Sequence, residues 1–359
     1  MSFQRVEPTN INKHSSLFVR RESSFRWHPQ ISEDHLLGVF GMTSILVADI
    51  GGTNARFGIA EVSSIGVVKC ASTLCFDCAS FTTFEGMVAE YLATLSKQPL
   101  YACFALAAPI VSDVVRLTNN ALTVDSAQIR SLFAFERVLL INDLVALAAS
   151  VARLSDEQKL VIQEGNHVNG PTSVLAAGTG FGATLVSPFN GGWAYIATEA
   201  GHQSFAPSEE LDFAIAAKLR GTMQHLSVEG LLSGIGLQRI HSALTEINGK
   251  VSDVLSANEI SYRAESLADA TCIEALSTFF SIFGSVAGDL ALAHGAFGGI
   301  YLGGGVVTKN APFIQSSRFL ERFSAKGKMT DVLRSVPIHV IQSNHAALVG
   351  AAHWFLQNS

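Results

Sequence analysis

The chain has 359 residues, which is long enough for two domains with substantial cores. Hydrophobic residues make up 48% of it and charged residues only 15%, so extensive disorder is excluded. The net charge of -6 offers no concentrated basic surface of the kind that binds nucleic acid, and we expect no nucleic-acid partner.

The cysteine content and the apolar runs indicate the cellular compartment of the protein and whether it spans a membrane. The five cysteines are an odd number spread through apolar stretches, which indicates reduced, buried thiols and a cytoplasmic protein. Cys75 and Cys78 have C-x-x-C spacing, but a zinc site needs four ligands and no second pair accompanies them, so we favour neither a metal nor a redox role. The uncharged run 290–308 contains six glycines, which suits a helix end and a Gly-rich strand better than a membrane helix. We therefore predict no membrane span.

Residues 1–41 differ from the rest of the chain. Basic and acidic residues are interleaved there without a sustained helical or strand period, and we expect disorder. The segment lacks the apolar core of a secretory signal and is too rich in acids for a typical transit peptide.

Residues 45–60 consist of two apolar runs joined by the tight polar turn 51–54, which predicts a strand, a loop and a returning strand. Glycines without Cβ let consecutive backbone N–H groups point at one oxygen-rich group, and a phosphate would fit there. Asp49 is the only acid at the end of the first run and is placed to hold Mg²⁺ through water. Considered alone, the stretch is explained equally well by an ordinary Gly-rich β-hairpin.

The same pattern recurs further along the chain. Residues 172–186 again form an apolar strand, a Gly/Thr loop and a returning strand, and a third loop, 303–305, follows the apolar run 300–302. Two phosphate-type hairpins far apart in one chain indicate a duplicated fold whose halves face each other across a nucleotide. The recurrence therefore favours the phosphate-binding interpretation.

The remaining chain alternates strands and helices. Further strands are predicted near 66–74, 101–107, 114–117, 138–141, 193–197 and 336–341. Helices are predicted over 81–96, 125–133, 144–154, 209–219, 231–244, 312–324 and 346–356. The run 264–294 suits one long helix or a pair broken near Gly284 or Gly288. A polar segment, 155–170, connects helix 144–154 to the second hairpin, so we expect a domain boundary near residue 154.

Two motifs in these loops resemble those of the bacterial glucokinase family, within the actin-like ATPase superfamily. They are Asp49-Ile-Gly-Gly-Thr-Asn-Ala-Arg56 and Ala177-Gly-Thr-Gly-Phe-Gly182, and the resemblance runs from about residue 42 to the C-terminus. It implies an α/β fold of two actin-like (ribonuclease H-like) domains with a nucleotide and sugar cleft between them. The small domain would comprise residues 42–154 and 344–359, and the large domain residues 155–343. The last helix would then return to pack on the small domain.

Asn142 and Asp143 follow an apolar strand and open a helix, and strand ends are where open α/β folds place their active sites. In isolation an ordinary helix cap explains them as well. The resemblance implies that Asp143 is the base that accepts the proton of the sugar hydroxyl, and that Asn142 and Asp143 bind the sugar.

The resemblance also assigns sugar binding to Glu199, His202 and Glu229. A carboxylate accepts hydrogen bonds from two vicinal hydroxyls and a histidine can donate and accept, so a few fixed groups can distinguish one sugar from another. Taken singly, the same residues suit a solvated acid or a loop histidine. Leu122 stands where the family usually carries an aromatic residue, so we expect the packing near the sugar pocket to differ from that of the family.

The implied substrates are ATP and glucose, with Mg²⁺ as the accompanying ion. No protein group would bind the metal directly, and Asp49 would hold it through water. The residues expected to bind Mg·ATP lie in or beside the three loops: Asp49, Gly51, Gly52, Thr53, Asn54, Gly178, Thr179, Gly180, Gly182, Gly303, Gly304 and Gly305.

The implied activity is the ATP-dependent phosphorylation of glucose to glucose 6-phosphate. The alternatives are a kinase for another hexose, a non-catalytic sugar-responsive regulator, and a nucleotide-driven assembly protein of the actin type. The presence of Asp143 together with the sugar-binding set disfavours the last two. A homodimer is compatible with the resemblance.

Overall fold

The structure is a computed structural model of the chain. It describes residues 43–63, 68–118, 120–166, 168–189, 192–221, 223–250 and 253–358. The expected disorder of residues 1–41 lies outside the described residues.

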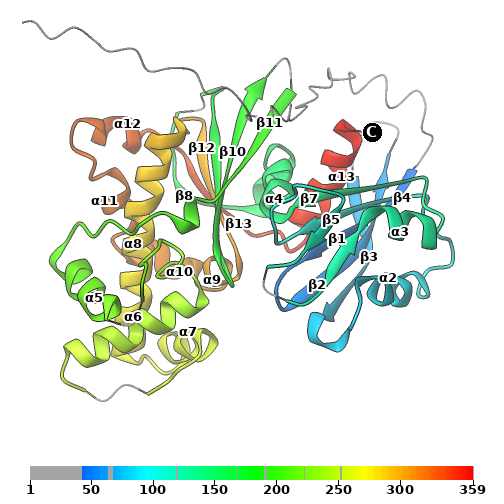
Figure 1. Cartoon of the computed structure of the whole chain (residues 1–359). Coiled ribbons are helices and arrows are strands. Elements are labelled where there is room, and N and C mark those ends of the chain that lie inside the picture. The colour runs from blue at the N-terminus through cyan, green and yellow to red at the C-terminus, as the bar shows by residue number, and fades with distance from the viewer. Residues whose placement is uncertain are drawn as a thin grey trace, which may run out of the picture.

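The first half of the chain builds a five-stranded sheet in the order β3-β2-β1-β4-β7 (Figure 1). Its strands are β1 (Thr43–Ile50), β2 (Asn54–Val62), β3 (Val68–Asp77), β4 (Tyr101–Leu106) and β7 (Arg137–Asn142). The strands β1, β2 and β3 are antiparallel neighbours, whereas β4 runs parallel to β1 and β7 runs parallel to β4. The first Gly-rich loop is therefore the turn between β1 and β2, as predicted.

A second sheet repeats this topology. Its strands are β9 (Thr172–Ala177), β10 (Phe181–Phe189), β11 (Gly192–Thr198), β12 (Gly299–Gly303) and β13 (Ile338–Ile341), with the extra edge strand β8 (Lys159–Gln163). The order β11-β10-β9-β12-β13 matches β3-β2-β1-β4-β7 strand for strand, including the parallel and antiparallel pairings. The match confirms the predicted duplicated α/β fold.

Helices and one short ribbon complete the described chain. The ribbon is formed by β5 (Val114–Arg116) and β6 (Thr123–Asp125). The helices of the first half and the C-terminus are α2 (Phe84–Leu92), α3 (Ser126–Leu132), α4 (Asp143–Ser150) and α13 (Ala346–Gln357). Those of the second half are α5 (Glu210–Arg220), α6 (Gly234–Ile247), α7 (Ala257–Ser266), α8 (Ala270–His294), α9 (Gly305–Lys309), α10 (Ala311–Ser316), α11 (Phe319–Ser324) and α12 (Thr330–Arg334).

The central strand β1 is buried on both faces, and its alternate side chains enter two different cores. Leu46 and Ile50 pack with the apolar side chains of α2 and α3. Ile45 and Val47 pack with those of α4 and α13. The C-terminal helix therefore returns to the first sheet, as the sequence predicted.

The long helix α8 crosses the core of the second half. A Cβ at Gly284 would lie 2.2 Å from the carbonyl oxygen of Phe319, and one at Gly288 would lie 2.3 Å from that of Phe323. Both glycines thus let α11 approach the helix closely without breaking it. One long helix is therefore the correct alternative of the two that the sequence allowed.

Among the described residues, α8 is the one helix whose length and composition would allow it to cross a membrane, with a mean hydropathy of 1.5 in its most apolar stretch. However, 83% of that stretch is buried inside the protein. Such burial is what a core helix requires, and the apolar side chains of α8 are accounted for by the packing around them.

The prediction of a polar connection over 155–170 was wrong, because this segment contains β8, which pairs antiparallel with β13. The polar ends of the strand concealed it. Lys159 forms an ion pair with Asp156 at 3.0 Å, and the side-chain amide of Gln163 donates to the carbonyl oxygen of Val336 at 2.7 Å.

Several predicted helices have different bounds, and β6, α7, α9 and α12 were not predicted. The helix expected over 312–324 is divided into α10 and α11, because Ser317 is extended and its hydroxyl accepts a hydrogen bond from the N–H of Phe319 at 3.2 Å. The helix expected over 231–244 begins at Gly234, where the hydroxyl of Ser233 caps it by accepting from the N–H of Gly236 at 3.1 Å.

The two sheets and their helices form two lobes that lie side by side (Figure 1). The chain passes from the first to the second after α4, and returns between β13 and α13. We propose to divide the protein at these crossings, into residues 42–154 with 344–359 and residues 155–343.

Candidate active site

Asp49 and Asn142 stand at the same edge of the first sheet. They lie at the ends of β1 and β7, which run parallel with β4 between them. The Oδ1 atom of Asn142 accepts hydrogen bonds from the N–H groups of Leu144 at 3.1 Å and Val145 at 3.2 Å. The helix cap that the sequence allowed is thus present, and it fixes Asp143 as the first residue of α4.

Asp143 has a carboxyl group in an environment that favours the protonated form. Burial, reinforced by the negative charge of Asp49, raises the pKa of Asp143 to about 7. The N–H of Leu144 at 2.9 Å and the amide of Asn142 at 3.1 Å donate to its Oδ1 and oppose this shift only in part. Burial also raises the pKa of Asp49, against the lowering effect of Arg56. A carboxyl group with a pKa near neutrality can take up and release a proton under physiological conditions.

Hydrogen bonds to backbone atoms of the first loop, 51–54, hold this loop in place. The N–H of Gly51 donates to the carbonyl oxygen of Asn54 at 2.9 Å. The carbonyl oxygen of Gly51 accepts from the side-chain amide of Asn120 at 3.2 Å and from Sγ of Cys78 at 3.6 Å. Thr53 and Asn54 are exposed, so the polar face of the loop is open to a ligand.

Sequence reasoning missed both of these supports. Cys75 is exposed on β3, whereas Cys78 is buried at the start of the short 3₁₀ helix Cys78–Ser80 that follows this strand, where its thiol reaches the loop. The only signal for Cys78 was its C-x-x-C spacing, which suggested a different chemistry.

The second loop, which includes Gly178, Thr179 and Gly180, contacts Glu229 directly. The N–H of Phe181 donates to Oε2 of Glu229 at 2.8 Å, and a Cβ at Gly180 would lie 2.4 Å from the same oxygen. The carbonyl oxygen of Gly178 accepts from the N–H at the start of α6, at 2.8 Å. Thus the structure places a predicted sugar-binding residue against a predicted phosphate-binding loop.

Glu199 and His202 are brought to Glu229 by backbone hydrogen bonds. The N–H of Glu229 donates to the carbonyl oxygen of Gly201 at 2.8 Å. The side chains of Glu199 and His202 are mostly exposed, and Oε2 of Glu199 lies 3.7 Å from Nε2 of His202. A further residue, His225, holds this segment: its Nε2 donates to the carbonyl oxygen of His202 at 2.9 Å. His225 lies in an irregular segment, and no sequence pattern marked it.

The third loop adjoins the second. Gly304 has a φ of +89°, and a Cβ there would lie 2.3 Å from the carbonyl oxygen of Ala177, so glycine is required. On the other side, a Cβ at Gly182 would lie 2.8 Å from Leu144, and one at Gly303 would lie 3.0 Å from Leu147. Since these leucines belong to α4, the helix that begins with Asp143 packs directly beneath the second and third loops.

The predicted residues thus form two groups. Asp49, Asn142 and Asp143 stand at the edge of the first sheet with the first loop, while Glu199, His202 and Glu229 stand beside the second loop. In the first group a hydrogen bond joins Asn142 to Asp143 and the charge of Asp49 acts on Asp143, and in the second group backbone hydrogen bonds connect the segments of all three residues. Within the described residues, no hydrogen bond or ion pair joins a member of one group to a member of the other.

The duplicated sheet, with Gly-rich loops at the ends of its central strands, defines a two-domain protein of the actin-like ATPase fold. The chain belongs to the glucokinase family, whose sequence profile, described as Glucokinase, matches residues 46–358. It is 36% identical over 321 residues to the glucokinase of Colwellia psychrerythraea, which covers 87% of this chain and 96% of that protein.

Solved structures agree. The crystal structure of glucokinase from an Antarctic psychrotroph superposes with a TM-score of 0.78 at 35% identity, covering 88% of this chain and 99% of that one. The glucokinase of Balamuthia mandrillaris, solved in complex with glucose, shares the fold at 20% identity, with a TM-score of 0.73 over 92% of this chain and all of that one.

Proposed function

We propose that the protein transfers the γ-phosphoryl group of ATP to glucose, giving glucose 6-phosphate and ADP. The observation that carries the proposal is the carboxyl group of Asp143, whose pKa is raised to about 7, at the start of a helix that packs beneath two Gly-rich loops. The relatives named glucokinase, at 36% identity over most of the chain, support glucose as the acceptor.

Asp143 would accept the proton of the sugar hydroxyl while the hydroxyl oxygen forms a bond to the γ-phosphorus of ATP. The bond between the γ-phosphorus and ADP breaks as this bond forms. Phosphoryl transfer depends mainly on alignment and charge stabilisation, so the base needs position more than strength. Asn142 is held in place by its cap, and its side-chain amide also donates to the carbonyl oxygen of Ala108 at 3.3 Å. This fixed position allows the asparagine to orient the sugar beside Asp143.

Glu199, His202 and Glu229 would bind the sugar hydroxyls from the other group. The exposed side chains of Glu199 and His202 can reach a ligand, and both remain joined to Glu229 through the backbone. Because Asn142 and Asp143 belong to the other group, glucose would bridge the two lobes and draw them together. Such closure excludes the water that competes with the sugar as phosphoryl acceptor.

The three loops would hold the phosphates of ATP, through the residues predicted for this role. Two features suit these loops to phosphate. Thr53, Asn54 and Thr179 are exposed, and at Gly304 the backbone of the third loop packs closely on that of the second, which only glycine permits. Mg²⁺, when bound, offsets the negative charge of the phosphates. Asp49 would hold its water shell, as the resemblance implies, from the end of β1, where its charge also acts on Asp143.

A panel assay tests the proposal directly. The purified protein would be supplied with glucose, mannose, N-acetylglucosamine or no sugar, and with Mg·ATP, another nucleoside triphosphate or polyphosphate. We expect glucose 6-phosphate from glucose and ATP, with little ATP hydrolysis in the absence of sugar. Product from another hexose alone would overturn glucose as the substrate. ATP hydrolysis that no sugar stimulates would favour an assembly protein. Sugar binding without turnover would favour a regulator.

We also infer a cytoplasmic location. The cysteines of the described residues are all free, and Cys75 is exposed. An exposed free thiol persists in a reducing compartment.

A further inference from the structure

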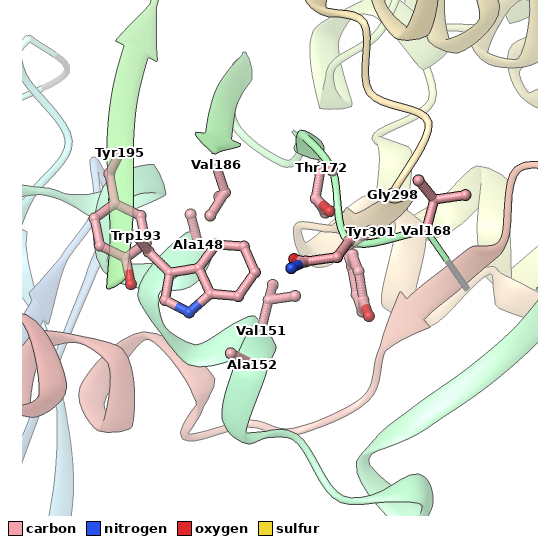
Figure 2. Close-up of a pocket in the computed structure, with 12 residues that line it drawn as sticks. Ala148, Val151, Ala152, Val168, Thr172, Val186, Trp193, Tyr195, Gly298 and Tyr301 are labelled. Atoms are coloured by element: carbon pink, nitrogen blue, oxygen red, sulfur yellow. The ribbon is translucent and has the colours of Figure 1, made fainter. Parts of the chain in front are cut away.

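A hollow lies at the end of α4 that is remote from Asp143 (Figure 2). The helix and the turn that follows it form one wall, with Ala148 and Ala152, and strands of the second sheet form the others, with Trp193, Tyr195 and Tyr301. Ala148 follows Asp143 by five residues, or about 7.5 Å along the axis of α4, Ala152 lies one turn further on, and no lining residue is one of the candidate site residues. The hollow is therefore separate from the candidate active site.

The size of the hollow fits a single aromatic ring. Its volume is about 170 Å³. An enclosed apolar cavity of about 150 Å³ binds benzene, and this hollow offers a comparable volume, although it is partly open to solvent and has polar as well as apolar walls. The rings of Trp193, Tyr195 and Tyr301 offer flat apolar walls to such a ligand, and aromatic pairs gain energy beyond the area that they bury.

The chemistry of the walls favours a neutral ligand. None of the described residues that line the hollow is charged. Burial raises the pKa of Tyr195 to about 12 and also raises the pKa of Tyr301, so both phenols stay neutral at physiological pH. Asn169 and Thr172 supply an amide and a hydroxyl for one or two hydrogen bonds. The cations that act on these tyrosines, Arg153 on Tyr195 and Lys159 on Tyr301, are not among the residues that line the hollow. A charged ligand would therefore lose its hydration without gaining an ionic partner in the walls.

The aromatic walls are held in place by contacts outside the hollow. The ring of Tyr301 lies against the ring of His339, with centroids 5.1 Å apart. The side chain of Gln357 of α13 lies close enough to Tyr195 to offset in part the rise that burial causes in its pKa. All three aromatic side chains also pack against the buried cluster that includes Ala148 and its neighbours. A ligand would therefore meet a site that is already formed and would lose little energy in ordering it.

We propose that this hollow binds a small, neutral, planar aromatic molecule of about the size of phenol, separately from the sugar and the nucleotide. One wall belongs to α4, in the first lobe, and the others to the second sheet, in the second lobe. A bound molecule would therefore contact both lobes, near the point where the chain first passes between them. If occupancy alters the affinity for glucose, glucose alters the affinity of the hollow by the same factor, as linkage requires.

The test uses 4-fluorophenol as the probe and fluorine NMR on the full-length protein. We expect saturable binding with a dissociation constant in the millimolar range, and binding of the anion 4-fluorobenzoate weaker by at least about tenfold. Ala152→Leu, at an exposed position, fills the hollow and should weaken 4-fluorophenol binding by at least about tenfold. Ala93→Leu, at the exposed position that directly follows α2, is the matched control and should leave it unchanged.

Other results would overturn the proposal. They are an absence of saturable binding, equal binding by the Ala152→Leu variant, or displacement of the probe in direct competition with glucose. A crystal soaked in 4-fluorophenol gives a second measurement that does not depend on any variant. A ring between Trp193 and Tyr301 supports the site, and an empty hollow at saturating probe refutes it. Because binding itself is measured, this outcome is independent of the proposed kinase activity.

Discussion

The carboxylate of Glu229 accepts a hydrogen bond from the backbone N–H of Phe181 at 2.8 Å. Glu229 thereby connects the proposed sugar site to the loop that is proposed to hold phosphate. Glu199 differs, because its side chain is 70% exposed and its ion-pair partner is His202 at 3.7 Å. Two acids that the sequence assigned to one role therefore have different surroundings.

We expect Glu229→Ala to raise the KM for both glucose and ATP, because it removes a sugar ligand and the acceptor that holds the loop. Glu199→Ala should raise the glucose KM alone, by about 10- to 150-fold, which corresponds to a charged hydrogen bond of about 1.5–3 kcal/mol. Steady-state kinetics with each substrate varied would measure both. Glu229→Gln is the control, since its amide oxygen can still accept from Phe181 and should restore the ATP KM. An ATP KM unchanged in Glu229→Ala would show that the hydrogen bond has no part in nucleotide binding.

The pH profile should follow the ionisation of Asp143. The base must be deprotonated to accept a proton, so kcat/KM should rise with pH to a plateau, with a midpoint near the raised pKa of about 7. The negative charge of Asp49 contributes to that pKa, so in Asp49→Asn the pKa of Asp143 and the midpoint should move to lower pH. An unchanged midpoint in Asp49→Asn would show that the charge of Asp49 does not raise the pKa of Asp143.

We expect Asp143→Asn to lower kcat by at least about 10²-fold, while glucose binding weakens far less. The asparagine keeps the size of the side chain but cannot accept the proton. If Asp143→Asn retains most of the native kcat, Asp143 is not the catalytic base.

The same variant should be more stable than the native protein at pH 8, by roughly 3–4 kcal/mol, because the pKa of Asp143 is raised from 3.8 to about 7 and each pKa unit corresponds to about 1.4 kcal/mol. Because the folded pKa of Asp143 lies above its unfolded value, the native protein loses stability as pH rises from about 4 to about 7. Asparagine does not titrate, so the difference should grow over that range and vanish near pH 4. Urea unfolding at pH 4, 6 and 8 would measure it, and a constant difference would contradict the shifted pKa.

Sequence patterns were enough for most of the fold. Apolar runs flanked by glycine predicted both hairpins, and their recurrence predicted the duplicated sheet, because a buried central strand needs a long apolar stretch. β8 was missed for the opposite reason: it is an edge strand with a charged residue at its first position, Lys159, and its partner β13 lies far along the chain. Pairing between distant segments leaves little local signal.

The sequence and the resemblance named candidate site residues but not their contacts. The resemblance named Glu229, yet nothing in the sequence placed its carboxylate on the N–H of Phe181. Asn120, Cys78 and His225 were missed because they act through backbone carbonyl groups, which any residue supplies. A pKa near 7 for Asp143 likewise depends on burial and on Asp49, which only the folded chain brings together.

The ion pair between Arg322 and Asp212 is buried, with side chains 4% and 1% exposed, and joins α11 to α5. Nη1 of Arg322 donates to Oδ1 of Asp212 at 3.0 Å, and Nη2 donates to the other carboxylate oxygen. Arg322→Met should therefore lower the free energy of unfolding by about 3–5 kcal/mol, because it leaves the buried charge of Asp212 without its ionic partner, held by hydrogen bonds from Ser208 and Glu209.

Removing both charges should cost less. The double variant Asp212→Leu with Arg322→Met buries no unpaired charge, so we expect it to be more stable than either single variant. Arg318→Met is the matched control: its side chain is 51% exposed, and such pairs contribute about 0–1 kcal/mol. Urea unfolding of the four variants would measure these differences. Because the pair lies among α5 and α11 and contacts none of the proposed site residues, kcat and both KM values should stay near native below the unfolding range. A double variant less stable than both single variants would show that the pair is a net source of stability.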